Sequence, residues 1–247
     1  MRTSTKILSA ALALIIASLL VYDTKLKAEY LKGDFRKPFG GFAQANFSNF
    51  NSIELRSGTA VNLVIEKGPY KVLVDPDAGD FVKISQQGGK LIIDASFKDH
   101  YRSLASDYTV FISCPGLTTF TSDARYDVNG SKVTDTLPNM FWKKPTLISG
   151  FSEGSLAITE DNGSNVRLEN NHLAHLNAVA GVSYHAGATL TIGPGNIFNA
   201  ADFRVLNKST LNIESPAGNN ITYHLADSAH LSTSGAISKQ LFKTIQP

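Results

Sequence analysis

The chain has 247 residues, of which 43% are hydrophobic and 18% are charged. This hydrophobic content excludes a wholly disordered protein, and the length suits one sizeable core or two small domains. The 23 basic and 21 acidic side chains nearly balance, which argues against a nucleic-acid partner because phosphate neutralisation needs a concentrated basic surface.

The N-terminus has the charged-then-apolar order of an export signal, since Arg2 and Lys6 precede an uncharged stretch from Ile7 to Tyr22. This stretch is somewhat shorter than the roughly 20 residues that a helix needs to cross a bilayer. No small-x-small cleavage site follows it. We therefore expect export to the periplasm or cell surface, with residues 1–22 as either a signal peptide or an uncleaved anchor. In the second case residues 7–22 associate with the inner membrane.

Cysteine usage gives a second constraint on the compartment and on the fold. The only cysteine, Cys114, lies far from the apolar run, so lipoprotein anchoring is not expected. A single cysteine also cannot form an internal disulfide. We expect a buried, inert thiol at the end of an apolar alternating run.

Residues 23–48 mix charged side chains with Pro38, Gly40 and Gly41, which predicts a linker. From Phe50 onward, short runs of alternating apolar and polar residues are separated by turn-forming clusters such as Gly88-Gly89. No helical periodicity interrupts them. The pattern predicts an all-β head domain over residues 49–243.

The C-terminal half repeats a phrase in which a turn-prone pair precedes a leucine, one spacer and an aliphatic residue. The phrase occurs at residues 154–158, 187–192 and 209–213. The leading apolar positions 156, 166, 176, 190, 211 and 231 are separated by roughly one or two multiples of ten residues, which is typical of a solenoid. Apolar residues two apart share one strand face, so stacked units share a core. We expect asparagine side chains to hydrogen-bond between the stacked units.

Residues 126–150 break this rhythm and predict an irregular insertion. The segment contains the only tryptophan, Trp142, beside Phe141, Lys143 and Lys144. An aromatic ring next to cations suits sugar stacking or partner contact. These four residues are therefore the candidate binding residues; the alternative is that Trp142 covers the open side of a coil.

The sequence contains only incomplete motifs for a metal site or an active site. His172 and His175 lie three apart, and on a regular strand such residues point to opposite faces, so a shared metal is not expected. Asp75, Asp77 and Asp80 lack the rest of a calcium loop and predict an ordinary turn. The acidic residues of the repeats lack the paired signature of glycan-cleaving enzymes. We predict no catalytic residue, no metal and no cofactor.

Five segments in this order resemble the family of "putative autotransporter adhesin head" domains, also called head GIN domains: residues 49–55, 60–63, 67–72, 89–93 and 110–117. The likeness extends from about residue 49 to 235. It implies a right-handed parallel β-helix-like solenoid of short strands in the bacterial cell envelope, and no catalytic residues. The interruption at residues 126–150 departs from the family pattern.

Together these observations predict an exported, adhesin-like envelope module that binds a protein or glycan and is not an enzyme. One alternative is a structural envelope protein that self-associates. Another is a β-helix enzyme acting on polysaccharides. The sequence leaves the ligand and the oligomeric state open.

Overall fold

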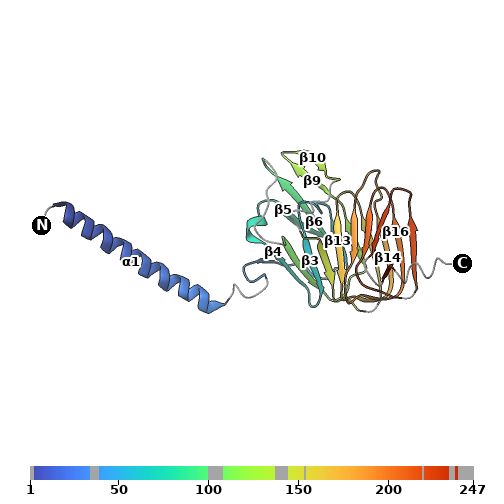
Figure 1. Cartoon of the computed structure of the whole chain (residues 1–247), viewed down its shortest axis with the longest axis horizontal. Coiled ribbons are helices and arrows are strands. Elements are labelled where there is room, and N and C mark those ends of the chain that lie inside the picture. Colours follow the sequence, from blue (N-terminus) through green and yellow to red (C-terminus); the bar gives the residue numbers. More distant parts are fainter. Residues whose placement is uncertain are drawn as a thin grey trace. The chain divides into compact units, whose positions relative to one another are not determined.

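The computed structural model describes residues 3–33, 39–99, 108–136, 144–152, 154–218, 220–233 and 237–238. The chain divides into two compact units, Met1–Phe42 and Ala43–Pro247. The first unit contains the helix α1, and the second contains the strands (Figure 1).

Helix α1 spans Thr3–Lys32 and buries none of its residues within the protein. In the described part of the chain it is the one helix long and apolar enough to cross a membrane, a property that signal sequences share. The helix continues through residues 23–32, assigned above to the linker, because neither proline nor glycine occurs there. It ends at Gly33, whose φ of +66° is left-handed.

In its described residues the second unit is built mainly of short strands, with a 3₁₀ turn at Pro76–Ala78. The strands are β1 (Ala43–Ala45), β2 (Ser52–Leu55), β3 (Leu63–Lys67), β4 (Lys71–Val74), β5 (Val82–Gln87), β6 (Lys90–Phe97), β7 (Val110–Cys114), β8 (Thr119–Ser122), β9 (Arg125–Val128), β10 (Ser131–Thr134), β11 (Thr146–Ser149), β12 (Ser155–Glu160), β13 (Asn165–Glu169), β14 (His172–Ala180), β15 (Thr189–Ile192), β16 (Ile197–Val205), β17 (Thr210–Ile213), β18 (Ile221–Leu225) and β19 (His230–Thr233).

These strands form two large sheets. The first has the order β1-β4-β7-β3-β11-β13-β15-β17-β19, and the second has the order β10-β9-β6-β2-β8-β12-β14-β16-β18, with β5 paired to β6. Both sheets are mixed, because parallel pairs dominate while β1, β4, β5 and β10 join in antiparallel fashion. The prediction of a chain dominated by β-structure is confirmed, with the N-terminal helix as the exception.

From β11 onward the chain passes alternately from one sheet to the other, and from β13 onward each strand pairs in parallel with the strand two before it. Leu211 pairs with Leu190 on one side and Leu231 on the other. The unit of about ten residues is therefore one strand with its turn, and two units return the chain to the same sheet. Figure 1 shows this order as a progression of colour along the unit.

The expected irregular insertion at residues 126–150 begins with most of a regular hairpin, β9–β10, and ends with β11. Asn129 and Gly130 close the hairpin with φ of +50° and +76°, the left-handed pair that a two-residue turn between twisted strands requires. The break in rhythm thus reflects a change from parallel to antiparallel pairing.

Both sheets contribute to one apolar core. Buried asparagines stabilise its turns: the Asn171 side-chain NH₂ donates to Asn196 Oδ1 at 3.1 Å and to the Ile148 carbonyl at 2.9 Å. The Asn196 side chain donates in turn to the Leu168 carbonyl at 2.8 Å. The predicted asparagine bonding between stacked units is confirmed at this pair, where it also satisfies carbonyls of the strands β11 and β13.

Candidate binding surfaces

A groove of about 550 Å³ lies where the hairpin β9–β10 adjoins the second sheet. Its walls come from β2, β6 and β8 together with the hairpin. Most of its side chains are charged or hydroxylated; the lining residues are Glu54, Leu55, Arg56, Asp94, Thr121, Asp123, Arg125, Lys132 and Thr134.

The charges in this groove are paired. Glu54 accepts hydrogen bonds from Arg56 Nε at 2.7 Å and from Lys90 Nζ at 3.0 Å. Arg125 Nε lies 2.9 Å from a carboxylate oxygen of Asp123. Burial raises the pKa of Glu54, but its hydrogen bonds to the two cations outweigh burial and hold the pKa below its ordinary value. The groove therefore offers fixed ionic groups at neutral pH.

The carboxylates of Asp94 and Asp123 are also held in place by hydrogen bonds from backbone amides and from neighbouring side chains. Asp94 Oδ1 accepts hydrogen bonds from the Ser57 hydroxyl at 2.9 Å and from the Ala95 amide at 2.8 Å. Asp123 Oδ1 accepts from the Ala124 amide at 2.7 Å and from the Asn162 side chain. A ligand would meet groups that are already oriented, which lowers the entropy cost of binding.

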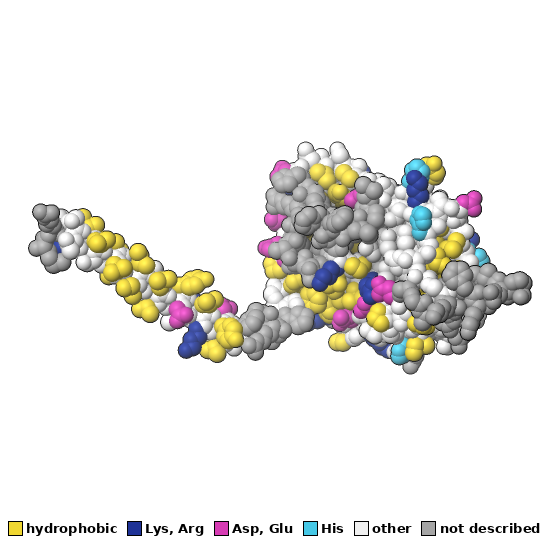
Figure 2. Space-filling view, viewed as in Figure 1, with side chains coloured by type: hydrophobic (Ala, Val, Ile, Leu, Met, Phe, Trp, Pro, Cys, Tyr) yellow, Lys and Arg dark blue, Asp and Glu magenta, His cyan; other side chains and the backbone are white. Residues whose placement is uncertain are grey.

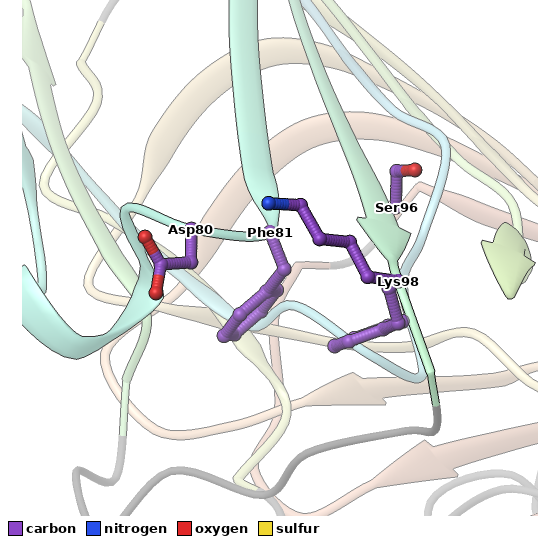
Figure 3. A pocket seen from close by; sticks show the side chains of 5 residues that line it. Asp80, Phe81, Ser96 and Lys98 are labelled. Atoms are coloured by element: carbon purple, nitrogen blue, oxygen red, sulfur yellow. The ribbon is translucent and has the colours of Figure 1, made fainter. Parts of the chain in front are cut away.

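A second, smaller pocket of about 140 Å³ is lined by Asp80, Phe81, Ser96, Phe97 and Lys98. The Phe81 and Phe97 rings stack with centroids 4.7 Å apart, and only 4% and 3% of these residues are exposed. Figure 3 shows the Lys98 side chain extending towards Phe81, with the Asp80 carboxylate on the other side of that ring. Because the rings belong to the core, this pocket presents little apolar surface, and packing explains its residues.

Of the four predicted binding residues, Phe141, Trp142 and Lys143 lie outside the described residues. Lys144 is exposed, and its Nζ lies 5.9 Å from the centre of the Tyr108 ring. Its carbonyl accepts a hydrogen bond from the Asn62 side chain at 3.2 Å. The binding role of this group stays a prediction.

The two histidines of β14 correct one expectation. His172 and His175 are both exposed, although residues three apart on a regular strand point to opposite faces. The reason is a change of phase at Ala174, because Leu173 and Leu176 are both buried in the core. No group of three metal-ligating side chains comes together in the ranges that the structure describes.

The aspartates at positions 75–80 form the predicted turn. Asp75 Oδ1 accepts a hydrogen bond from the Asp77 amide at 2.9 Å and so caps the 3₁₀ turn. Cys114 is buried, as expected, and burial raises the pKa of its thiol to about 11. Both features are structural.

Sequence reasoning missed the groove because its residues are spread over some eighty positions and meet only through strand pairing. The parallel pairing of β2 with β8 and the hairpin β9–β10 bring them together. Asn129-Gly130 was the available signal, since this dipeptide between alternating residues indicates a hairpin.

No family model matches the chain. No curated protein matches it either. Several solved structures are similar at 10 to 12% identity. A "putative adhesin" from Bacteroides fragilis NCTC 9343 has a TM-score of 0.44, 11% identity, and coverage of 78% of this chain and 96% of its own.

A second "putative adhesin", from Parabacteroides distasonis ATCC 8503, has a TM-score of 0.36 at 11% identity, with coverage of 78% and 96%. A "putative lipid binding protein" from the same organism has a TM-score of 0.33 at 12% identity, with coverage of 79% and 94%. These similarities are too weak to assign a family or a ligand.

Proposed function

We propose that the chain is an exported, adhesin-like binding module of the cell envelope that has no catalytic activity. Its β unit is a right-handed β-helix-like solenoid, and its ligand is a protein or glycan of the envelope. The observation that carries the proposal is the charged groove of about 550 Å³ beside the hairpin β9–β10.

The N-terminal helix supports an envelope location. Its hydrophobic side chains are exposed along the helix, as Figure 2 shows in yellow. Such a surface is stable in a bilayer or in an export channel and is unfavourable in water. The helix would deliver the β unit to the periplasm or cell surface, as a cleaved signal or as an anchor in the inner membrane.

The acidic groups favour binding over catalysis. Glycan-cleaving enzymes place a protonated carboxyl and an ionised one on either side of the scissile bond. In the groove, Glu54 is held ionised by Arg56 and Lys90. Burial raises the pKa of Glu160 well above its ordinary value, but Glu160 is completely buried and would not reach a substrate.

Self-association is a second candidate, favoured by the last strand of the second sheet. β18 pairs on one side with β16, and its Leu225 is 44% exposed. Edge strands with apolar side chains pair readily with another chain. Light scattering of the purified chain tests this candidate: a concentration-dependent dimer that Leu225→Lys abolishes would favour it.

The test of the binding proposal is a pull-down from an envelope extract together with a glycan array. The full chain in detergent is compared with an Arg56→Ala/Arg125→Ala/Lys132→Ala variant. The control, Lys71→Ala/Lys83→Ala/Arg204→Ala, removes the same charge from exposed positions outside the groove. Binding lost in the groove variant and kept in the control supports the proposal.

Two results would count against it. A folded wild type that retains no envelope component and no glycan would contradict a binding function. Equal weakening in both variants would show only general charge attraction. A Trp142→Ala variant in the same experiment tests the residues chosen from sequence: loss of binding without loss of stability assigns them a role.

A further inference from the structure

The turn between β14 and β15 is longer than the equivalent turns of neighbouring coils. Residues 181–188 separate these strands, whereas four residues separate β12 from β13, β16 from β17 and β18 from β19. We refer to residues 181–187 as the Tyr184 loop. Tyr184 is 82% exposed and Val182 is 55% exposed, so burial does not account for either side chain.

The loop is fastened to the turns on both sides of it. The Ser183 amide donates to Asp161 Oδ1 at 2.7 Å, and its hydroxyl donates to Asp161 Oδ2 at 2.5 Å. The Asn207 side chain donates to the carbonyls of Gly181, at 2.9 Å, and Val182, at 3.2 Å. These bonds fix a loop whose tip is exposed, so a ligand would not have to order it.

The tip presents two stacked rings. The Tyr184 and His185 rings have centroids 3.9 Å apart and planes at 23°. His185 has a φ of +59°, in the left-handed region. Seven other described non-glycine residues lie there, and five of them are asparagines. Asparagine or glycine would fit that backbone more easily. The left-handed backbone at His185 thus goes together with an exposed ring that stacks on Tyr184.

We propose that the Tyr184 loop binds a sugar ring of a glycan, with one C–H face of a pyranose lying on the Tyr184 ring. The negative face of an aromatic ring attracts polarised C–H groups. The exposed Lys208, next to Asn207 in the adjoining turn, and the partly exposed Asp161 supply polar partners for the hydroxyl groups.

The size of the exposed patch selects this ligand. Among the described residues, the exposed rings and apolar side chains of the loop are those of Val182, Tyr184 and His185. A stable protein partner buries about 800 Å² on each side, roughly 20 to 30 residues. A pyranose needs only the area of one or two rings. The inference names the ligand class and rests on the proposed binding function.

The test uses saturation-transfer NMR on the full chain in a detergent without sugar headgroups. The probes are cellobiose, lactose, maltose and N,N′-diacetylchitobiose, each titrated separately. We expect at least one to bind, Tyr184→Ala to weaken it about tenfold, and Tyr184→Phe to keep it within about twofold. His185→Asn, which suits the left-handed backbone, should weaken it by a smaller factor. The control is Ile197→Ala, which removes another exposed apolar side chain and should change nothing.

Three results would overturn the inference. One is no saturation transfer from any of the four saccharides. Another is saccharide binding that Tyr184→Ala leaves intact while the groove variant loses it, which would place the sugar in the groove. The third is retention of an envelope protein by the wild type with no saccharide signal, which would leave the proposed binding function standing.

Discussion

The two halves of the β unit are built in different ways. From β11 to β19 the described strands pair only in parallel, one coil after another. From β1 to β10 parallel pairs alternate with antiparallel ones at β1–β4–β7, β5–β6 and β9–β10. Both halves contribute to one core, while the two proposed binding surfaces lie where the chain departs from regular coiling. The groove borders the hairpin β9–β10, and the Tyr184 loop is a turn that is longer than its neighbours.

The largest loss of stability is expected when one buried leucine in each half is replaced by alanine. Leu211 in β17 and Leu91 in β6 are both completely buried. Each substitution by alanine should lower the free energy of unfolding by about 2–5 kcal/mol through lost burial and a cavity. Because both belong to one core cluster, denaturant unfolding should show a single transition in both variants. A separate transition in Leu91→Ala would mean that the antiparallel half unfolds by itself.

A smaller loss of stability is expected when one glycine in each half is replaced by alanine. Gly181 has a φ of +86°, and a Cβ there would overlap Ser209 Oγ and lie 2.5 Å from the Leu206 carbonyl oxygen. Gly88, in the antiparallel hairpin, has a φ of +58° and nothing within 4 Å of a Cβ. Gly181→Ala should cost more than about 2 kcal/mol and Gly88→Ala about 1 kcal/mol, because only the first adds overlap to strain. Thermal unfolding measures both; equal losses would contradict the close approach of the coils.

The buried carboxyl at the end of β12 predicts a pH dependence. Glu160 is completely buried, and among the described residues no donor meets its carboxyl oxygens at full hydrogen-bond geometry, although the Val166 amide lies nearby. Burial raises its pKa, and the Val166 backbone amide opposes this only in part. The unfolded chain loses this proton above about pH 4.3 while the native state keeps it. Stability from this group therefore falls as pH rises from there to the folded-state pKa.

Glu160→Gln should remove this pH dependence and raise stability at neutral pH by about 1–3 kcal/mol. Glu169→Gln is the matched control, because Glu169 is partly exposed and paired with Arg167. Denaturant midpoints from pH 4 to pH 8 measure the effect. A wild type that gains stability over this range relative to Glu160→Gln would contradict a buried, protonated Glu160.

The smallest signal is expected from the buried thiol of the first half. Cys114 ends β7, which pairs in antiparallel fashion with β4 and in parallel with β3. The thiol is buried and its pKa is raised to about 11, so a thiol reagent at pH 8 should label it only after unfolding. Rapid labelling of the native chain would show that β7 separates from β3 or β4.

Much of the regular half could be predicted from sequence. The apolar residues two apart and the spacing near ten residues correspond to strands and turns that alternate between the sheets. The spacing of fourteen between positions 176 and 190 also marked the longer turn that contains Tyr184. Local patterns sufficed here because each coil pairs with its neighbour in the chain.

The rest depends on contacts that local patterns do not contain. The Asn129-Gly130 turn could be recognised in the sequence. The pairing of β9 with β6, which forms the groove, could not. The burial of Glu160 was not predicted. Its alternation with Leu156 and Ile158 places it on the buried face, but a charged residue is not expected there. The change of phase at Ala174 recurs in the paired strand β16, where Phe198 and Ala201 are both buried, and it breaks the alternation from which strand faces are predicted.

Hydrogen–deuterium exchange of the full chain, with and without a glycan-rich envelope fraction, tests the central claim most directly. If binding occurs at departures from the regular coils, peptides covering residues 125–134 and 181–187 should be protected by the fraction. The turn at residues 206–209 should change only through Lys208 and its contact with the Tyr184 loop, and the regular turn at residues 226–229 should not change. Protection confined to the regular turns, or none anywhere, would contradict the account.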